Sequence, residues 1–102
     1  MHPSFEHQFE WDSVKARLNY RKHGITFERA ATVFHDPRAL SLFDEEHSSS
    51  EDRWITLGLE QGGVPVVVCH TFEHEEGYHK ARVRIISARK ATRREIQQYR
   101  EV

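Results

Sequence analysis

The chain has few of the residues that form disulfides, membrane spans or large cores. Its single cysteine, Cys69, excludes an internal disulfide. No apolar run is long enough to span a bilayer or to form the core of a signal peptide, so we expect a cytoplasmic protein. Hydrophobic residues make up only 37% of the 102 residues. The length predicts one domain, residues 9–102 after a flexible tail at 1–8. The low hydrophobic share predicts a thin core and a surface partly covered by another chain.

Charge is unevenly distributed along the chain. Residues 78–102 hold eight Lys and Arg and two Glu, whereas residues 1–77 hold seven Lys and Arg and 14 Asp and Glu. The net charge of −1 therefore hides two halves of opposite sign. This distribution predicts a basic face able to hold phosphates and an acidic part that repels them or attracts a basic partner.

The first part of the domain carries helix signals. Asp12 precedes a helical pattern in which Val14 and Leu18 share one side, and Gly24 follows a basic last turn. A second helix is expected at residues 26–35, before an Asp-Pro pair that stops it. The sequence therefore predicts two short helices close together in the chain.

The remainder reads mainly as strands. We expect a four-stranded antiparallel meander with strands at residues 39–43, 54–59, 64–69 and 78–87. A C-terminal helix is expected to start at Thr92 or the nearby Ala91 and to run to Tyr99. The segment around Phe9 suits an extra strand at the sheet edge, and an acidic loop at residues 44–52 separates the first two strands of the meander. The predicted fold class is α+β.

The fourth strand is strongly cationic. Alternation predicts one packed face with Ala81, Val83 and Ile85, and an opposite face with Lys80, Arg82, Arg84 and Ile86. Like charges spaced two residues apart repel each other, which favours neutralisation by a polyanion or an acidic protein segment. A solvated sheet face, with Lys and Arg stems covering apolar surface, is an equally good interpretation.

Two signatures resemble a known family. The first is the helix end Asn19-x-x-Lys22-His23-Gly24, and the second is the strand-to-helix run Ile86-Ser87-Ala88-Arg89-Lys90-Ala91. They are accompanied by Phe9-Glu10-Trp11-Asp12, Glu51-Asp52-Arg53-Trp54, Glu95 and Tyr99. From Phe9 onward the chain resembles the BrnT family of toxins.

The resemblance implies a fold, an activity and a partner. The implied fold is RelE-like, a small antiparallel sheet with helices against one face. The implied activity is metal-independent endoribonuclease cleavage that inhibits translation and needs no cofactor. The implied partner is a BrnA-like antitoxin of ribbon-helix-helix type, whose complex with the toxin binds operator DNA.

The candidate catalytic cations are the arginines of the matched motifs, Arg53, Arg84 and Arg89. RNA cleavage without a metal needs a base for the 2′-hydroxyl, cations for the charge that builds on phosphorus, and an acid for the leaving oxygen. Arginine suits the second role because its planar fork binds two phosphate oxygens and stays charged.

For proton transfer the candidates are His23 and Glu51, with His70 and His79 as weaker choices. Further RNA contacts are expected from Lys15, Lys80, Arg82 and Lys90. Each acid–base candidate has a structural alternative. His23 fits an ordinary helix stop, and Glu51 can simply pair with Arg53.

Two other classes of function compete with the ribonuclease. His70-Thr71-Phe72-Glu73-His74 has the H-x-x-E-H form of some zinc proteases, but strand geometry separates its two histidines by roughly 13 Å. The second competitor is a binding module without catalysis, in which the same arginines hold nucleic acid or an acidic antitoxin segment. The chain contains no zinc finger or aromatic RNA-binding strand motif that would identify such a module.

Overall fold

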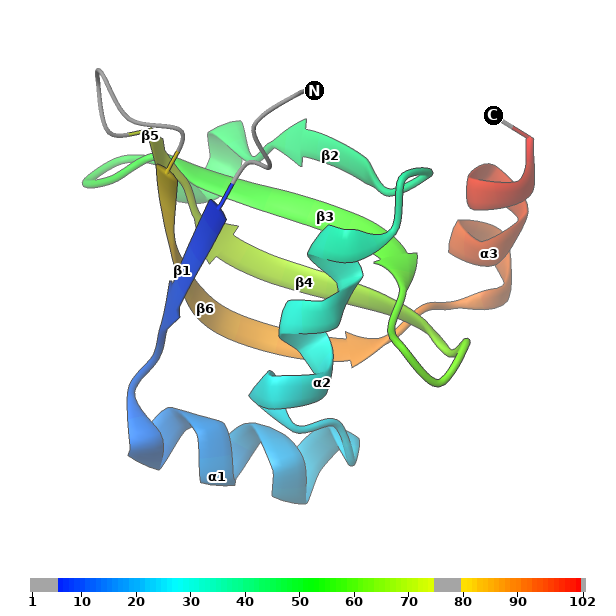
Figure 1. Cartoon of the computed structure of the whole chain (residues 1–102), viewed down its shortest axis with the longest axis horizontal. Coiled ribbons are helices and arrows are strands. Elements are labelled where there is room, and N and C mark those ends of the chain that lie inside the picture. Colours follow the sequence, from blue (N-terminus) through cyan, green and yellow to red (C-terminus); the bar gives the residue numbers. More distant parts are fainter. Residues whose placement is uncertain (1–5, 75–79, 102) are drawn as a thin grey trace.

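A computed structural model describes residues 6–74 and 80–101, which form an α+β domain (Figure 1). The strands and helices follow the order β1 (Glu6–Glu10), α1 (Ser13–His23), α2 (Phe27–Ala31), β2 (Leu40–Phe43), β3 (Arg53–Leu59), β4 (Pro65–Thr71), β5 (Glu73–His74), β6 (Lys80–Lys90) and α3 (Arg93–Arg100). Short 3-10 turns lie between α2 and β2, at Thr32–His35, and between β2 and β3, at Glu45–His47. Strand β1 begins inside the segment expected to be a tail, while residues 1–5 lie outside the described residues.

The sheet is mixed. Its order is β1-β6-β4-β3-β2, with β5 paired to β6 beside β4. Neighbours β2, β3, β4 and β6 pair antiparallel in the order expected for the meander. The N-terminal edge strand is present as well, but β1 pairs with β6 in parallel, a direction that the sequence pattern did not predict.

The helix signals in the sequence act as expected. The Asp12 side chain accepts a hydrogen bond from the Lys15 backbone N–H at 2.9 Å, and Gly24 ends α1 in the left-handed region at φ 70°. Thr26 caps α2 through the Arg29 backbone N–H. The second helix is shorter than predicted, because after Ala31 it tightens into a 3-10 turn.

One face of the sheet holds the main core. Helix α2 crosses this face, and α1 runs along the β6 edge of the sheet, from which Ala16 packs against the same core (Figure 1). We call it the helix-covered face. Its fully buried side chains come from the loop after α1, from α2 and the 3-10 turn that follows it, and from the two strands β4 and β6: Ile25, Phe27, Ala30, Val33, Val66, Val68, Val83, Ile85 and Ala88. The predicted packed face of the cationic strand is therefore confirmed.

A bulge changes the alternation along β6. The register runs from His70 opposite Ile85 to Cys69 opposite Ser87, so β6 holds one extra residue, Ile86, between these pairs. As a result Ala88 returns to the main core. The strand also continues to Lys90, so the prediction that it ends near Ser87 is wrong. Arg89 therefore lies in the strand rather than at a junction.

Helix α3 packs on the other face of the sheet. Tyr99 is buried there against Leu57 and Val67 in a small second core. Its hydroxyl donates a hydrogen bond of 2.7 Å to Asp36 Oδ2, which also accepts one from the Leu59 backbone N–H. We call this the open face, because α3 covers only one end of it. None of the helices in the described ranges is long and apolar enough to cross a membrane.

The buried Asn19 links α1 to β6 just after the bulge. Its Oδ1 accepts from the Ala88 N–H at 3.1 Å, and its Nδ2 donates to the Ala88 carbonyl at 2.8 Å. Pairing with β1 ends at Arg84, so this side-chain amide satisfies backbone groups that lie beyond the end of the neighbouring strand.

We expect Asn19→Ala to destabilise the domain by about 2–4 kcal/mol, because it leaves two buried backbone groups unpaired. Urea unfolding at neutral pH measures this loss. The exposed Ser13→Ala in the same helix is the control. Equal stability of the two variants would show that Asn19 does not hold the bulge region.

Candidate active site

The open face brings the three predicted catalytic arginines to one side of the sheet. Arg53 stands on β3, and Arg84 and Arg89 stand on β6. Arg84 and Arg89 are an odd number of residues apart, so an uninterrupted strand would place them on opposite faces. The extra residue Ile86 reverses the alternation and puts both on the open face.

Glu51 joins two of these arginines. Its Oε1 accepts hydrogen bonds from Arg84 Nη2 and, at 3.4 Å, from Arg53 Nη2. The side chains are about one-third exposed for Glu51 (33%) and Arg53 (33%), and Arg84 is more open at 42%. With two cations and one carboxylate, this group keeps one net positive charge. We call it the Glu51 cluster.

The Glu51 cluster has spare capacity to bind an anion. Arg53 Nε is buried and has no hydrogen-bond partner among the residues that the structure describes. A buried guanidinium N–H without a partner is unfavourable unless an acceptor reaches it. Because Nε is enclosed, a phosphate oxygen becomes its acceptor only when the Arg53 side chain turns toward the surface. The cluster's net positive charge is already accessible, since the Arg53 and Arg84 side chains are 33% and 42% exposed.

Arg89 is held by a second carboxylate. Its Nη1 and Nη2 donate to the two Glu95 oxygens at 2.8 and 2.9 Å, a bidentate pair. Glu95 also accepts from the Thr92 backbone N–H and so completes the capping box of α3. The guanidinium is rigidly oriented, but its charge is neutralised within the protein.

Both carboxylates are strongly acidic in this setting. The hydrogen bond from Arg84 holds the pKa of Glu51 below its usual value. The hydrogen bond from Arg89 lowers the pKa of Glu95 to about 2, and the same contact raises the pKa of Arg89. Both groups therefore stay ionised at neutral pH and are poor proton donors.

The two arginine groups lie apart along β6. Strand geometry separates the Cα atoms of Arg84 and Arg89 by roughly 15 Å. Between them the open face carries Cys69 and Ser87, which are opposite each other in the β4–β6 register. The three arginines therefore share a face, but they form two groups that can contact different phosphates of one strand rather than a single tight cage.

His23 belongs to neither arginine group. It is the last residue of α1, which runs along the β6 edge of the sheet, and it precedes the Gly24 stop. His70 points to the helix-covered face, where it is buried. His79 lies outside the described residues. Among the described residues, Glu51 contacts Arg53 and Arg84, whereas His70 is buried on the helix-covered face and His23 belongs to neither arginine group.

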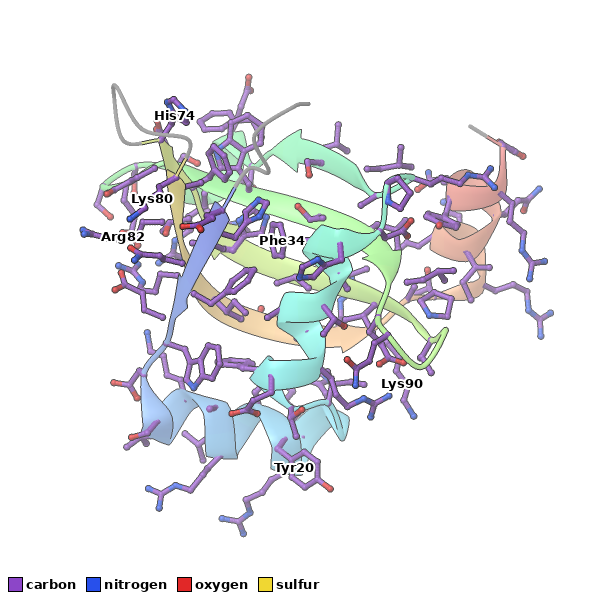
Figure 2. All side chains as sticks on the ribbon, in the orientation of Figure 1. Tyr20, Phe34, His74, Lys80, Arg82 and Lys90 are labelled. Carbon is purple, nitrogen blue, oxygen red and sulfur yellow. The ribbon has the colours of Figure 1, made fainter. Side chains whose placement is uncertain are left out.

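The predicted RNA-binding residues divide in the same way. Lys80 and Arg82 precede Arg84 on β6 at the two-residue spacing of its open face, and Arg82 is exposed. Lys15 stands on α1, and Lys90 is paired with Val66 of the helix-covered face. Figure 2 shows Arg82 and Lys90 near opposite ends of the sheet. Trp54 packs against Phe43 on the helix-covered face, with ring centroids 5.3 Å apart.

The H-x-x-E-H segment lacks the geometry of a zinc site. His70 donates from Nδ1 to the Thr71 carbonyl at 2.9 Å and accepts at Nε2 from Thr56 Oγ1 at 2.6 Å, so both ring nitrogens have protein partners. Burial lowers the pKa of His70, which favours this neutral form. Within residues 6–74 and 80–101, no group of three or more His, Cys, Asp and Glu is placed to hold a metal ion.

Sequence reasoning did not select Glu95 as a site residue. Thr92-x-x-Glu95 has the sequence form of a capping box, which indicates a helix start. It does not indicate that the same carboxylate reaches back to Arg89. The pairing depends on the bulge, which turns Arg89 toward the side on which α3 packs.

Comparison with known proteins identifies the family. The family model described as "Ribonuclease toxin, BrnT, of type II toxin-antitoxin system" matches residues 11–95 of this chain. This chain therefore belongs to the BrnT family of ribonuclease toxins. A search of curated proteins gave no match.

A solved structure has a similar fold. The crystal structure of the Brucella abortus ribonuclease toxin BrnT aligns with a TM-score of 0.60 and 21% sequence identity. The alignment covers 86% of this chain and 99% of the Brucella chain. The likeness supports the α+β fold of three helices against a mixed sheet.

The Arg89–Glu95 pair predicts a pH dependence. Because the pKa of Glu95 is about 2, the pair stabilises the folded state at pH values above the ordinary glutamate pKa, and this contribution is lost as pH falls toward 2. We expect the free energy of unfolding of Glu95→Gln to be about 1 kcal/mol lower than that of the parent at pH 7. Near pH 2.5 the two free energies of unfolding should be closer together. Urea unfolding at both pH values measures this difference, with the exposed Glu46→Gln as control. The same difference in free energy of unfolding at both pH values would rule out a stabilising ion pair.

Proposed function

We propose that this protein is a metal-independent endoribonuclease that cleaves RNA on the open face of its sheet and thereby inhibits translation. The observation that carries the proposal is the Glu51 cluster, where two arginines and one carboxylate keep a net positive charge on an uncovered sheet surface. Membership in the ribonuclease toxin family gives this anion site its substrate class. We also infer that the fold is RelE-like, which the main core between α2 and one face of the sheet supports.

In the proposed reaction the scissile phosphate binds to Arg53 and Arg84. The phosphate takes the place of part of the Glu51 contact and accepts from Arg53 Nε. The released Glu51 carboxylate takes the proton of the 2′-hydroxyl, whose oxygen attacks phosphorus while the bond to the 5′-oxygen breaks. The products are a 2′,3′-cyclic phosphate and a 5′-hydroxyl, the latter protonated by water. Each positioned guanidinium donor is worth about 10² to 10³ in rate.

Arg89 has a different proposed role. Because Glu95 neutralises it, we assign it to an adjacent phosphate of the same strand rather than to the scissile one. Lys80 and Arg82 would contact RNA phosphates in the other direction along β6. Lys15 and Lys90 would contact RNA only if the RNA strand passes round the edge of the protein sheet. Arg89 therefore orients the substrate, while the Glu51 cluster stabilises the transition state.

We further propose the partner and the cellular setting. A type II toxin-antitoxin family implies an antitoxin that binds the toxin. We expect a BrnA-like protein of ribbon-helix-helix type, through which the complex binds operator DNA, and we expect both proteins to act in the cytoplasm.

A binding module with the same basic surface and no catalysis is the alternative. It is favoured by the neutralisation of Arg89, since an ion-paired arginine is common in purely structural settings. Expression of the chain alone and with its antitoxin distinguishes the two. A toxin arrests growth alone and is rescued by the partner, whereas harmless expression of folded protein supports the module.

Removal of single arginines tests the site. We expect Arg84→Ala to lower cleavage of naked RNA, with chelator present, by about 10² to 10³, and Arg89→Ala to lower it by about tenfold. Both should melt within about 5 °C of the parent. The exposed Arg100→Ala at the end of α3 is the matched control. Full activity of folded Arg84→Ala would refute the proposed site.

The pH profile distinguishes Glu51 from a histidine base. Because the pKa of Glu51 is lowered, the carboxylate stays ionised and kcat/KM should be flat from pH 8 down to about 5. A histidine base would lose activity below about pH 6.5 as it gains a proton. His23→Ala should leave cleavage unchanged. A midpoint near pH 6.5 that disappears in His23→Ala would contradict our assignment.

A further inference from the structure

Helix α1 shows its larger apolar side chains to solvent. Val14 is 51% exposed and Leu18 is 57% exposed, although they share one side of the helix as the sequence predicted. The opposite side packs against the sheet through the buried Asn19 and the partly buried Ala16. The apolar pair of this helix therefore does not contribute to the protein's own core.

Cations surround this apolar pair. Helix α1 carries Lys15, Arg17, Arg21 and Lys22, and it has no acidic residue between Ser13 and His23. None of the four forms an ion pair with another of the described residues, whereas the arginines of the open face are paired to Glu51 and Glu95. The surface is therefore basic without internal compensation.

A shallow groove extends the same surface toward α2. It has a volume of about 380 Å³, and besides Ala16 and Thr26 it is lined by Arg17, Tyr20, Arg21, Phe27 and one carboxylate, Glu28. Tyr20 is 54% exposed, and Figure 2 shows it directed away from the sheet at the lower edge of the molecule. The groove gives the apolar pair a neighbouring depression with an aromatic wall and two guanidinium groups.

We propose that this outer face of α1, formed by Val14, Leu18, Arg17 and Arg21 with the Tyr20 groove, binds an acidic amphipathic segment of the antitoxin. The segment would present apolar side chains to Val14 and Leu18 and carboxylates to the flanking cations. The proposal rests on the toxin-antitoxin part of the proposed function.

Charge and hydrophobicity together favour a protein segment over RNA. RNA phosphates would satisfy the four cations, but they would leave Val14 and Leu18 in water. An amphipathic segment buries the apolar pair and neutralises the cations in one contact, the groove-binding mode that short helices use. Because no residue of this surface belongs to the Glu51 cluster, this contact anchors the antitoxin without competing for the catalytic arginines.

Two substitutions test the surface. Leu18→Ser removes an apolar contact and Arg21→Ser removes a charge, and both sites are exposed, so folding should be retained. Leu42→Ser is the matched control, because Leu42 is 72% exposed on the edge strand β2, away from α1. The probe is the purified antitoxin encoded beside the toxin gene. Calorimetry gives its affinity, and cleavage of naked RNA is measured in parallel.

We expect Leu18→Ser and Arg21→Ser each to weaken antitoxin binding by at least about tenfold, on the cost of losing a buried anchor or a desolvated charge pair. Leu42→Ser should bind like the parent, and all three should cleave RNA within twofold of it. Unchanged affinity of Leu18→Ser would overturn the proposal. Loss of RNA cleavage in Arg21→Ser with antitoxin affinity intact would assign the surface to RNA instead. Absence of cleavage in the parent would refute the proposed activity, while the affinities would still decide this proposal.

Discussion

The candidate site depends on a single β-bulge. Without the extra residue Ile86, Arg84 and Arg89 would lie on opposite faces of β6, and Ala88 would leave the main core. The bulge is held from the side by Asn19, whose amide pairs with both backbone groups of Ala88. Packing of α1 and placement of the arginines are thus parts of one arrangement, which explains why the helix signature and the strand signature occur together in this chain.

The arginines of the open face are not equally available to bind an anion. Glu95 neutralises Arg89 and uses the same carboxylate to cap α3, so that interaction contributes mainly to rigidity. The single Glu51 carboxylate pairs with two arginines, so the cluster keeps one positive charge. It also keeps a buried guanidinium N–H that has no partner among the described residues. A nearly neutral chain can therefore still bind a phosphate, because local charge at one place on the sheet decides binding and net charge does not.

Local signals predicted most of the fold. Asp12, Gly24 and Thr92 marked helix ends correctly, since caps depend on neighbouring residues alone. The bulge and the parallel pairing of β1 could not be predicted, because both depend on contacts between distant segments. For the site, the motif arginines and Glu51 do share the open face. The sequence could not show that His23 belongs to neither arginine group, or that Glu95 holds Arg89.

The central claim is that RNA phosphates bind the open face at Arg53 and Arg84. A crystal structure with a short RNA carrying a 2′-deoxy group at the cleavage position, which blocks attack but keeps the phosphate, tests it most directly. The account predicts a phosphate within hydrogen-bond distance of Arg53 Nε and Arg84, with the next one near Arg89. RNA bound only on the helix-covered side, with the Glu51 cluster unchanged, would contradict it.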